Sequence, residues 1–279
     1  MFCFHLARPV ELEPELTLFL RENGSALDIE IEISWDWDAA PKPHSEEIGR
    51  DLLQVYYAEA DRLFCMTRGG LKGFIAGCWY TPDFCRMVCT INEKTFLTTP
   101  KKLGLLLRFL PMRAIFQHFG VLFFHAAQIE LDGRGILFTA PSGTGKTTQA
   151  DLWVRHENAR LICNDRTLLR KTDGIWYTYG YPVDGSAPVR SGESHPLACV
   201  VLLSQAKENQ ISRLRSGKAV ARLMPQLVMD GWSADARMRG MELLLELLKD
   251  IPVYHLACTP DEDAVACLKH QLKEDGMIG

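Results

Sequence analysis

A short loop of glycine, serine and threonine between two regularly patterned segments is the feature that most constrains this chain. Residues 135–140 (GILFTA) form an apolar run typical of a buried strand, and residues 146–157 (KTTQADLWVRHE) read as a helix. The loop between them, with Ala140 in place of the first glycine, fits the Walker A pattern of P-loop proteins. Strand, loop and helix in this order predict an α/β unit built around a phosphate-binding turn.

The chemistry of such a turn explains its residue types. Glycines let successive backbone N–H groups point inward around a phosphate, and the start of the helix adds its positive dipole end. We expect Lys146 to reach the terminal phosphates of ATP and the Thr147 hydroxyl to bind Mg²⁺. A glycine-rich turn that binds nothing is the alternative. The predicted nucleotide-binding residues are Pro141, Ser142, Gly143, Thr144, Gly145, Lys146, Thr147 and Thr148.

An acidic residue follows the predicted helix at the distance that the chemistry needs. A triphosphate site requires a carboxylate near the metal, and the segment ARLICNDRTLL gives a short apolar strand that ends at Asn164 and Asp165. Between Lys146 and Asp165 there is room for one helix and a return strand, so the acid is expected beside the loop. The alternative is that Asn164 and Asp165 form only a turn, which opens the hairpin TLLRKTDGIWYTY.

These segments together resemble the HPr kinase/phosphorylase-like proteins, whose nucleotide-binding core is shared with the phosphoenolpyruvate carboxykinases. The likeness rests, in order, on VLFFHAAQIEL with His125, APSGTGKTT, LICNDRTLL and GYPVDGSAPVRSGESHPLACVVLLSQAKEN, and it covers roughly residues 118–272. It implies a mixed-sheet P-loop core of the HPr kinase/PEP carboxykinase type. It also implies a catalytic set in which His125 lies near the transferred phosphoryl group, Lys146 binds phosphate, and Asp165 binds metal or accepts a proton.

Two departures from the family limit what the resemblance implies. Asn164 stands in place of the first aspartate of the family's pair, and a neutral amide can hold metal or substrate but cannot act as a base. The glycine-rich C-terminal signature for binding HPr is missing, so we expect a different substrate.

The sequence leaves the roles of three residues open between a functional and a purely structural one. Arg166 and Arg190 are basic residues that we expect near the phosphates and the substrate, although surface arginines are common. On periodicity alone His125 also fits a buried core histidine.

The N-terminal part of the chain carries no recognisable motif. We interpret residues 1–118 as a β-rich region of unknown role with a helical bridge at its end, and residues 119–279 as the P-loop kinase-like nucleotide-binding domain. The segments ALDIEIEISW and GLKGFIAGCWY read as strands, and EEIGRDLLQVYY as a helix. Turn signals at Asp132-Gly133 and Asp173-Gly174 predict hairpins, hence a mixed rather than a purely parallel sheet.

Composition and charge argue against nucleic acid and membranes as binding partners. The 279 residues carry a formal net charge of −4 with basic and acidic residues interspersed, which gives no electrostatic footprint for nucleic acid or for a membrane surface. No segment is apolar enough to predict a membrane span. Nine cysteines without a Cys-x-x-Cys pair predict a reducing, cytoplasmic environment. A homo-oligomer is left open.

The sequence therefore predicts a Mg²⁺- and ATP-dependent kinase that transfers the γ-phosphoryl group to a hydroxyl of a peptide or protein serine or of a small molecule. A non-catalytic nucleotide-binding sensor or assembly partner is one alternative, because Asn164 removes a carboxylate. A PEP carboxykinase-like enzyme acting on a three-carbon acid is the other.

Overall fold

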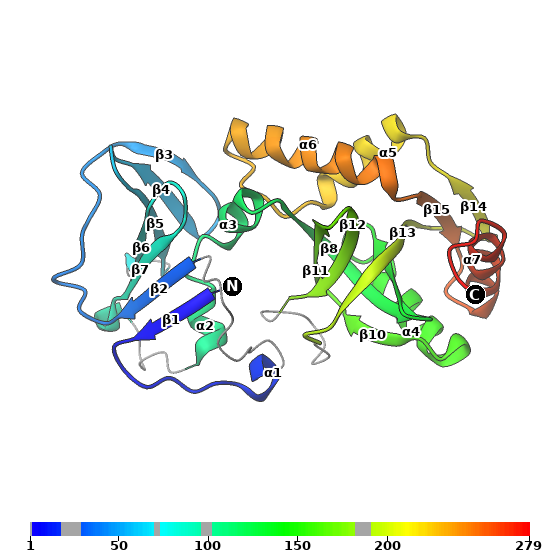
Figure 1. The fold of residues 1–279 in the computed structure, drawn as a ribbon, viewed down its shortest axis with the longest axis horizontal. Helices are drawn as coiled ribbons and strands as arrows, with labels where there is room; N and C mark the ends of the chain where they lie inside the picture. Colours follow the sequence, from blue (N-terminus) through cyan, green and yellow to red (C-terminus); the bar gives the residue numbers. More distant parts are fainter. Residues whose placement is uncertain (1, 18–28, 70–72, 96–101, 182–190) are drawn as a thin grey trace. The chain divides into compact units, whose positions relative to one another are not determined.

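The chain divides into two compact units, and each is described by itself. The computed structural model describes residues 2–17, 29–69, 73–95, 102–181 and 191–279 (Figure 1). Unit 1 consists of residues 1–118 together with 230–236, and unit 2 of residues 119–229 together with 237–279. The sequence did not indicate that a short segment from the second half of the chain completes unit 1.

Unit 1 is built on a seven-stranded mixed sheet with the strand order β1-β2-β7-β6-β5-β4-β3. Strands β1, β2 and β7 pair in parallel and the remaining neighbours are antiparallel. The strands are β1 (Phe2–Leu6), β2 (Ile29–Ser34), β3 (Glu47–Arg50), β4 (Gln54–Ala58), β5 (Leu63–Arg68), β6 (Phe74–Tyr80) and β7 (Arg86–Ile91). The helices are α1 (Pro14–Thr17), η2 (Glu93–Thr95), α2 (Leu103–Leu107) and α3 (Met112–His118).

The helix predicted over EEIGRDLLQVYY is wrong, because this segment forms strands β3 and β4. The side chain of Asp51 accepts hydrogen bonds from the backbone N–H groups of Leu53 and Gln54, at 2.9 and 2.7 Å. A side chain that satisfies backbone donors in this way stabilises a turn in place of a helix. The strand assignment of IEIEIS in β2 is confirmed, with its three isoleucines buried and its glutamates exposed.

Residues 230–236 close one face of unit 1. The Trp232 ring lies 4.9 Å from the Tyr56 ring between centroids, and it fills the space in which Gly49 would carry a side chain. The Tyr56 hydroxyl donates to Asp230, at 3.3 Å, and Arg113 pairs with Asp51, at 2.6 Å. Aromatic packing and a half-buried polar cluster therefore join the two parts of this unit.

Unit 2 is built on an eight-stranded mixed sheet, which confirms the prediction of mixed pairing. Strand β9 runs parallel to β13, and β13 parallel to β15, while β8, β11 and β12 pair in antiparallel fashion. The strands are β8 (Val121–Leu131), β9 (Arg134–Thr139), β10 (Arg160–Cys163), β11 (Arg166–Thr172), β12 (Ile175–Gly180), β13 (Ser194–Gln205), β14 (Gln210–Arg213) and β15 (Val253–Cys258). The helices are α4 (Lys146–Glu157), α5 (Ser216–Leu223), η3 (Met224–Gln226), α6 (Ala234–Asp250, in unit 2 from residue 237) and α7 (Glu262–Glu274).

Both predicted hairpin turns are confirmed. The turn between β8 and β9 has Asp132 at φ 50° and Gly133 at φ 77°, and the turn between β11 and β12 has Asp173 at φ 51° and Gly174 at φ 80°. Positive φ at both central residues is the requirement of the type I′ turn, which aspartate and glycine meet with least strain.

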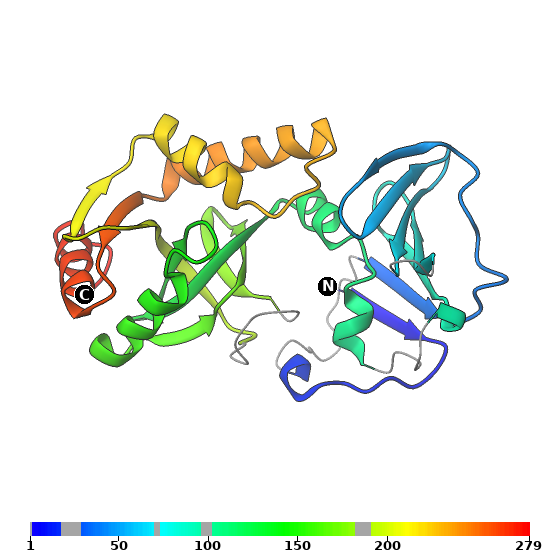
Figure 2. The same ribbon diagram turned by 180° about the vertical axis from the view of Figure 1, so that it is seen from behind.

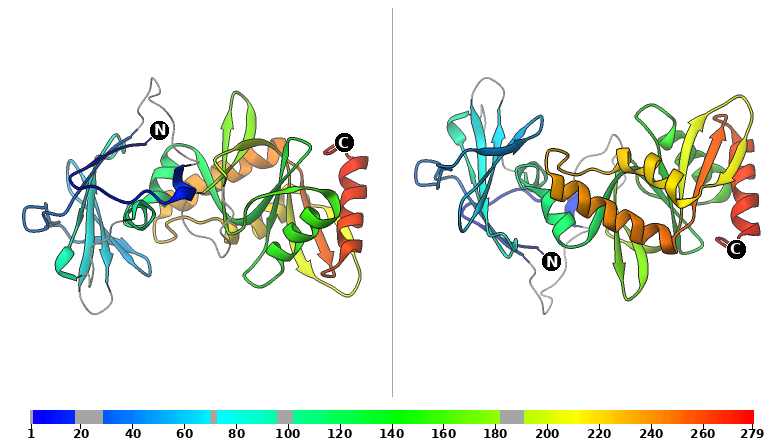
Figure 3. Two further views of the ribbon diagram at one scale, coloured as in Figure 1. Left: turned by 90° about the horizontal axis from the view of Figure 1, so that it is seen from below. Right: turned by 90° about the horizontal axis from the view of Figure 1, so that it is seen from above.

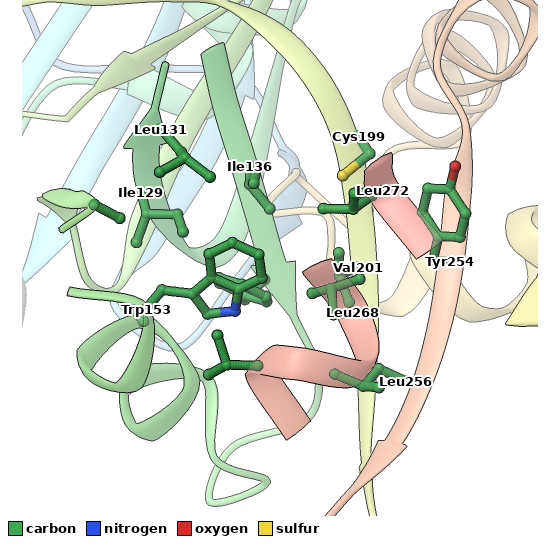
Figure 4. Packing of buried hydrophobic residues seen from close by; sticks show 14 of the residues in the cluster. Ile129, Leu131, Ile136, Trp153, Cys199, Val201, Tyr254, Leu256, Leu268 and Leu272 are labelled. Carbon is green, nitrogen blue, oxygen red and sulfur yellow. The ribbon is translucent and has the colours of Figure 1, made fainter. Parts of the chain in front are cut away.

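Helices cover both faces of the central strands of unit 2. Along β9, Ile136 and Phe138 pack into a cluster with residues of α4 and α7, whereas Leu137 packs into a cluster with residues of α5 and α6. Figure 4 shows the first cluster, in which the fully buried Trp153 of α4 lies among side chains from β8 and β9. The views in Figures 2 and 3 show α6 on one side of these strands and α4 on the other. The strand that leads into the loop is thus held on both faces.

No helix among the described residues has the length and apolar character needed to cross a bilayer.

Candidate active site

The loop between β9 and α4 has a backbone that only glycine adopts readily at two positions. Gly143 has φ 76° and Gly145 has φ 111°, and a Cβ atom built on either residue meets no atom within 4 Å. Glycine is therefore required there by backbone conformation and not by lack of space. Gly145 is the N-cap of α4, and no side chain among the described residues caps this helix. The first N–H groups of α4 are consequently available to an anion.

Lys146 lies back over the loop that carries it. Its Nζ donates hydrogen bonds to the carbonyl oxygen of Ala140, at 2.9 Å, and to that of Pro141, at 3.3 Å. Burial lowers the pKa of the Lys146 ammonium, and the nearby Asp165 carboxylate opposes that shift. The lysine at the loop and the acid after β10 therefore lie within electrostatic reach of each other, as their spacing predicts.

His125 and Asp165 form a direct pair. The Nε2 atom of His125 lies 3.0 Å from Oδ1 of Asp165, and about a third of each side chain is exposed. Strand pairing sets this geometry: His125 is opposite Arg166 in the register of β8 and β11, and the N–H of Ala126 donates to the Asp165 carbonyl, at 3.0 Å. The hydroxyl of Thr139, the last residue of β9, donates to the His125 carbonyl, at 2.9 Å.

The pKa of His125 lies below its ordinary value. Burial is the largest cause, the Lys146 charge adds to it, and Asp165 opposes it. The imidazole is therefore neutral at neutral pH, beside a carboxylate that can stabilise it once it takes up a proton.

Asn164 is buried with an unused oxygen. Only 7% of its surface is exposed, and its Oδ1 has no hydrogen-bond partner within the described part of the chain. An orphaned buried oxygen next to a carboxylate is a natural ligand for a hard cation. Thr147, exposed at the start of α4, offers a hydroxyl oxygen of the same chemistry.

The oxygen atoms of Asp165, Asn164 and Thr147 are too few to hold a cation without other ligands, and this fits Mg²⁺ bound together with phosphate. No group of three or more His, Cys, Asp or Glu side chains in the described ranges could hold a metal ion. Mg²⁺ is commonly held by one or two carboxylates together with substrate phosphates, and it needs no all-protein cage. The residues that would hold it here are Asp165, Asn164 and Thr147.

The two predicted arginines have different outcomes. Arg166 lies beside the pair, with its Nε 3.6 Å from Oδ2 of Asp165 and its guanidinium carbon 5.8 Å from the centroid of the Phe123 ring. Arg190 lies outside the residues that the structure describes, so its expected place near the phosphates stays a prediction.

Two cavities of unit 2 meet at this site and share Pro225 and Gln226. The larger has a volume of about 750 Å³ and is lined by Pro141, Ser142, Gly143, Thr144, Leu202, Leu203, Ser204, Gln205, Arg222, Pro225, Gln226 and His255. The smaller has a volume of about 320 Å³ and is lined by His125, Asp165, Arg166, Pro225, Gln226, Leu227 and Val228. Residues 141–144 of the loop line the first cavity, and the His125–Asp165 pair lines the second.

The part of the larger cavity that β13, α5 and β15 form was missed by the sequence interpretation. It includes Ser204 of β13, Arg222 of α5 and His255 of β15, and none of these belongs to a motif. They reach the loop because β13 pairs with β9 so that Leu202 is opposite Thr139, which brings the carboxyl ends of both strands to one edge. A weak signal was present in the apolar run ACVVLL, which ends in polar residues as strands near a ligand do.

Comparison with known proteins gives a loose structural likeness. No curated protein matches this chain. Among solved structures, the Hpr(Ser) kinase/phosphatase from Coxiella burnetii is similar over 55% of this chain and 98% of its own, at 12% identity and a TM-score of 0.33. A superposition this loose says nothing about individual residues.

Comparison with family models gives a specific match. Residues 87–262 match the family described as SynChlorMet cassette protein ScmC. The matched region takes in the loop, the His125–Asp165 pair and the cavity wall formed by β13, α5 and β15. Because the match covers more than half of the chain, the protein belongs to the ScmC family of SynChlorMet cassette proteins.

Proposed function

We propose that this protein is a Mg²⁺-ATP-dependent kinase that transfers the γ-phosphoryl group to a hydroxyl, on a peptide or protein serine or on a small molecule. One observation carries the proposal. A histidine–carboxylate pair, with 3.0 Å between Nε2 and Oδ1, lies near enough to the loop for the Lys146 charge to lower the pKa of the histidine. A phosphoryl-transfer site needs these two elements close together.

The loop would bind the nucleotide. The left-handed glycines and the uncapped start of α4 present backbone N–H groups to the phosphates. Lys146 would exchange its hydrogen bonds to the carbonyls of Ala140 and Pro141 for bonds to phosphate oxygen, which carries more negative charge. Pro141, Ser142 and Thr144, which line the larger cavity, and Thr148 of α4 would complete the surface for the nucleotide.

The metal would be held by oxygen atoms after β10 and at the start of α4. Asp165 presents two carboxylate oxygens, so it can keep His125 on one and offer the other to Mg²⁺. The buried Oδ1 of Asn164 and the hydroxyl of Thr147 supply neutral oxygens. Bound there, Mg²⁺ supplies neutralisation of phosphate charge.

The acceptor hydroxyl would enter the smaller cavity. There a neutral His125 can take the hydroxyl proton, and Asp165 stabilises the imidazolium that results. Arg166 adds a positive charge beside the pair. Since the transition state of phosphoryl transfer is loose, positioning and charge neutralisation suffice, and the single carboxylate left by Asn164 does not prevent the reaction.

Phosphoryl transfer from labelled ATP tests the proposal directly. The protein is incubated with Mg²⁺ and γ-labelled ATP, first with serine-containing peptides and then with a hydroxyl-bearing small-molecule fraction. We expect label to enter one of the two classes with the native protein and to fall by about two orders of magnitude or more in Asp165→Asn. Asp173→Asn is the matched control, because Asp173 occupies an exposed turn and asparagine tolerates its left-handed φ of 51°.

The alternative function predicts a different result. A nucleotide sensor would bind Mg²⁺-ATP without labelling either class of acceptor, and Asp165→Asn would change binding alone.

A further inference from the structure

The larger cavity has the phosphate loop as one wall and the ends of β13 and β15 as another. The amide of Gln205 donates to the carbonyl oxygen of Gly143, at 3.4 Å, which links the end of β13 to the loop. A volume of about 750 Å³ lies within the range of cavities that take small-molecule ligands, about 300 to 1,000 Å³. The cavity can therefore admit a ligand whose anionic end lies at the loop.

Arg222 is an unpaired cation on this wall. It lies on α5 with an exposed side chain, lines the cavity, and makes no salt bridge or hydrogen bond to any residue that the structure describes. Together with burial, its charge lowers the pKa of His255. An arginine that lines the same cavity as this loop can bind an oxyanion with its planar fork of N–H donors.

Ser204 and His255 form a neutral hydrogen-bonding pair beside Arg222. The Ser204 Oγ atom lies 2.9 Å from Nε2 of His255, which joins neighbouring strands β13 and β15. The lowered pKa of His255 favours its neutral imidazole. Among the described residues that line the cavity, Arg222 is therefore the side chain with a permanent positive charge.

Resting on the proposed nucleotide binding, we propose that Arg222 binds the phosphate chain of the nucleotide from the part of the cavity formed by β13, α5 and β15, supported by the one hydrogen bond that the Ser204–His255 pair can still donate. The loop supplies mainly neutral backbone donors and one charge, Lys146. A triphosphate carries more negative charge than Lys146 and one divalent cation neutralise, so a further positive side chain in the same cavity would add to the neutralisation. Arg222 acts in binding and charge neutralisation, and the hydroxyl proton is still taken at His125.

Calorimetric titrations of the native protein, Arg222→Gln and Arg222→Lys with Mg²⁺-ATP, Mg²⁺-tripolyphosphate and adenosine test this assignment. We expect Arg222→Gln to weaken both ATP and tripolyphosphate binding by about 10- to 100-fold, the value of a charge-assisted hydrogen bond, and to leave adenosine binding unchanged. Arg222→Lys should recover part of the loss, since it keeps the charge without the planar fork. Arg170→Gln is the matched control, because Arg170 is exposed on β11 and lines neither cavity.

An NMR titration of His255 gives a second readout that does not depend on activity. Arg222→Gln should raise the His255 pKa in the free protein, and tripolyphosphate should raise it in the native protein by placing negative charge nearby. Equal tripolyphosphate affinity in native protein and Arg222→Gln overturns the inference while the proposed function stands. A loss confined to adenosine or to the nucleoside part of ATP also overturns it. A native protein that binds neither ATP nor tripolyphosphate overturns both proposals together.

Discussion

Lys146 donates a hydrogen bond to the carbonyl oxygen of Ala140, the residue at which its own loop begins, over 2.9 Å. Carbonyl oxygens of the loop itself thus accept hydrogen bonds from the Lys146 ammonium, and burial lowers the pKa of that ammonium. A phosphate that enters the loop must compete with a carbonyl dipole, which a charged oxygen does easily. If the loop binds phosphate as proposed, this arrangement should favour anions, because a neutral ligand gains too little to displace the carbonyls.

Lys146→Met should abolish stabilisation by ATP. In the native protein, ATP at 100 times its dissociation constant should stabilise the fold by about 2.7 kcal/mol, seen as a rise in the unfolding temperature. The variant should show no such rise, while its own unfolding temperature stays close to that of the native protein, because the change removes a partly buried charge. Lys207→Met, at an exposed position, should keep the full effect of ATP. A retained ATP effect in Lys146→Met would remove the phosphate-binding assignment of the loop.

The acid side of the pH–activity profile should report His125. A general base works only when unprotonated, so kcat/KM should fall as the pH drops through the His125 pKa, which lies below 6.5. In His125→Gln the rate should drop and this acid limb should disappear. An NMR titration of the His125 ring would locate the same pKa independently. An acid limb above pH 6.5, or one that persists in His125→Gln, would assign the base elsewhere.

Two alanine substitutions should show whether Gly145 is required for its positive φ or for lack of space around it. Gly145→Ala places a side chain at φ 111°, which should cost about 1 to 3 kcal/mol of stability or shift the loop, and ATP binding should be lost with it. Gly217→Ala, in α5, also meets no atom within 4 Å but has no positive φ, and it should stabilise the protein by about 0.5 kcal/mol. Unfolding in urea together with ATP titration measures both. Equal effects of the two substitutions would show that the loop conformation is not restrictive.

Unit 1 should lose stability as the pH rises through the range in which Asp230 ionises. Burial raises the pKa of Asp230 to about 6, and Arg113 and Tyr56 only partly oppose it. The folded state therefore binds more protons than the unfolded state between roughly pH 4 and 6, so stability falls with rising pH there, by about 3 kcal/mol in total. Asp230→Asn should remove this slope. Hydrogen exchange of β4 and β5 at pH 4, 5, 6 and 7 would measure it, and parallel pH dependences in the two proteins would exclude Asp230 as the cause.

The sequence predicts well what depends on local chemistry. The strand, the glycine positions and the helix of the loop follow from neighbouring residues, as do the turns at Asp132-Gly133 and Asp173-Gly174. The error over EEIGRDLLQVYY also has a local cause: its apolar spacing fits a helix, but Asp51 folds it into a turn. A search for apolar spacing detects the helical periodicity but does not detect the hydrogen bonds from the backbone N–H groups to the Asp51 side chain.

What depends on long-range pairing could not be predicted. The resemblance placed His125 and the spacing placed Asp165 near the loop, but their contact results from the register of β8 and β11. Arg222 and His255 enter the cavity only because β13 and β15 lie beside β9, and nothing in their own neighbourhood marks them.

The late segment 230–236 bears on how unit 1 can be made. Trp232 packs against Tyr56 and Gly49, so a fragment that stops at His118 would expose the Tyr56 ring and would be more prone to aggregate. During translation the same face stays open until residues 119–229, which include the strands from β8 to β14, and the segment 230–236 have left the ribosome. Completion of unit 1 therefore waits for the synthesis of residues 119–229, and isolating unit 1 calls for joining residues 230–236 to residues 1–118.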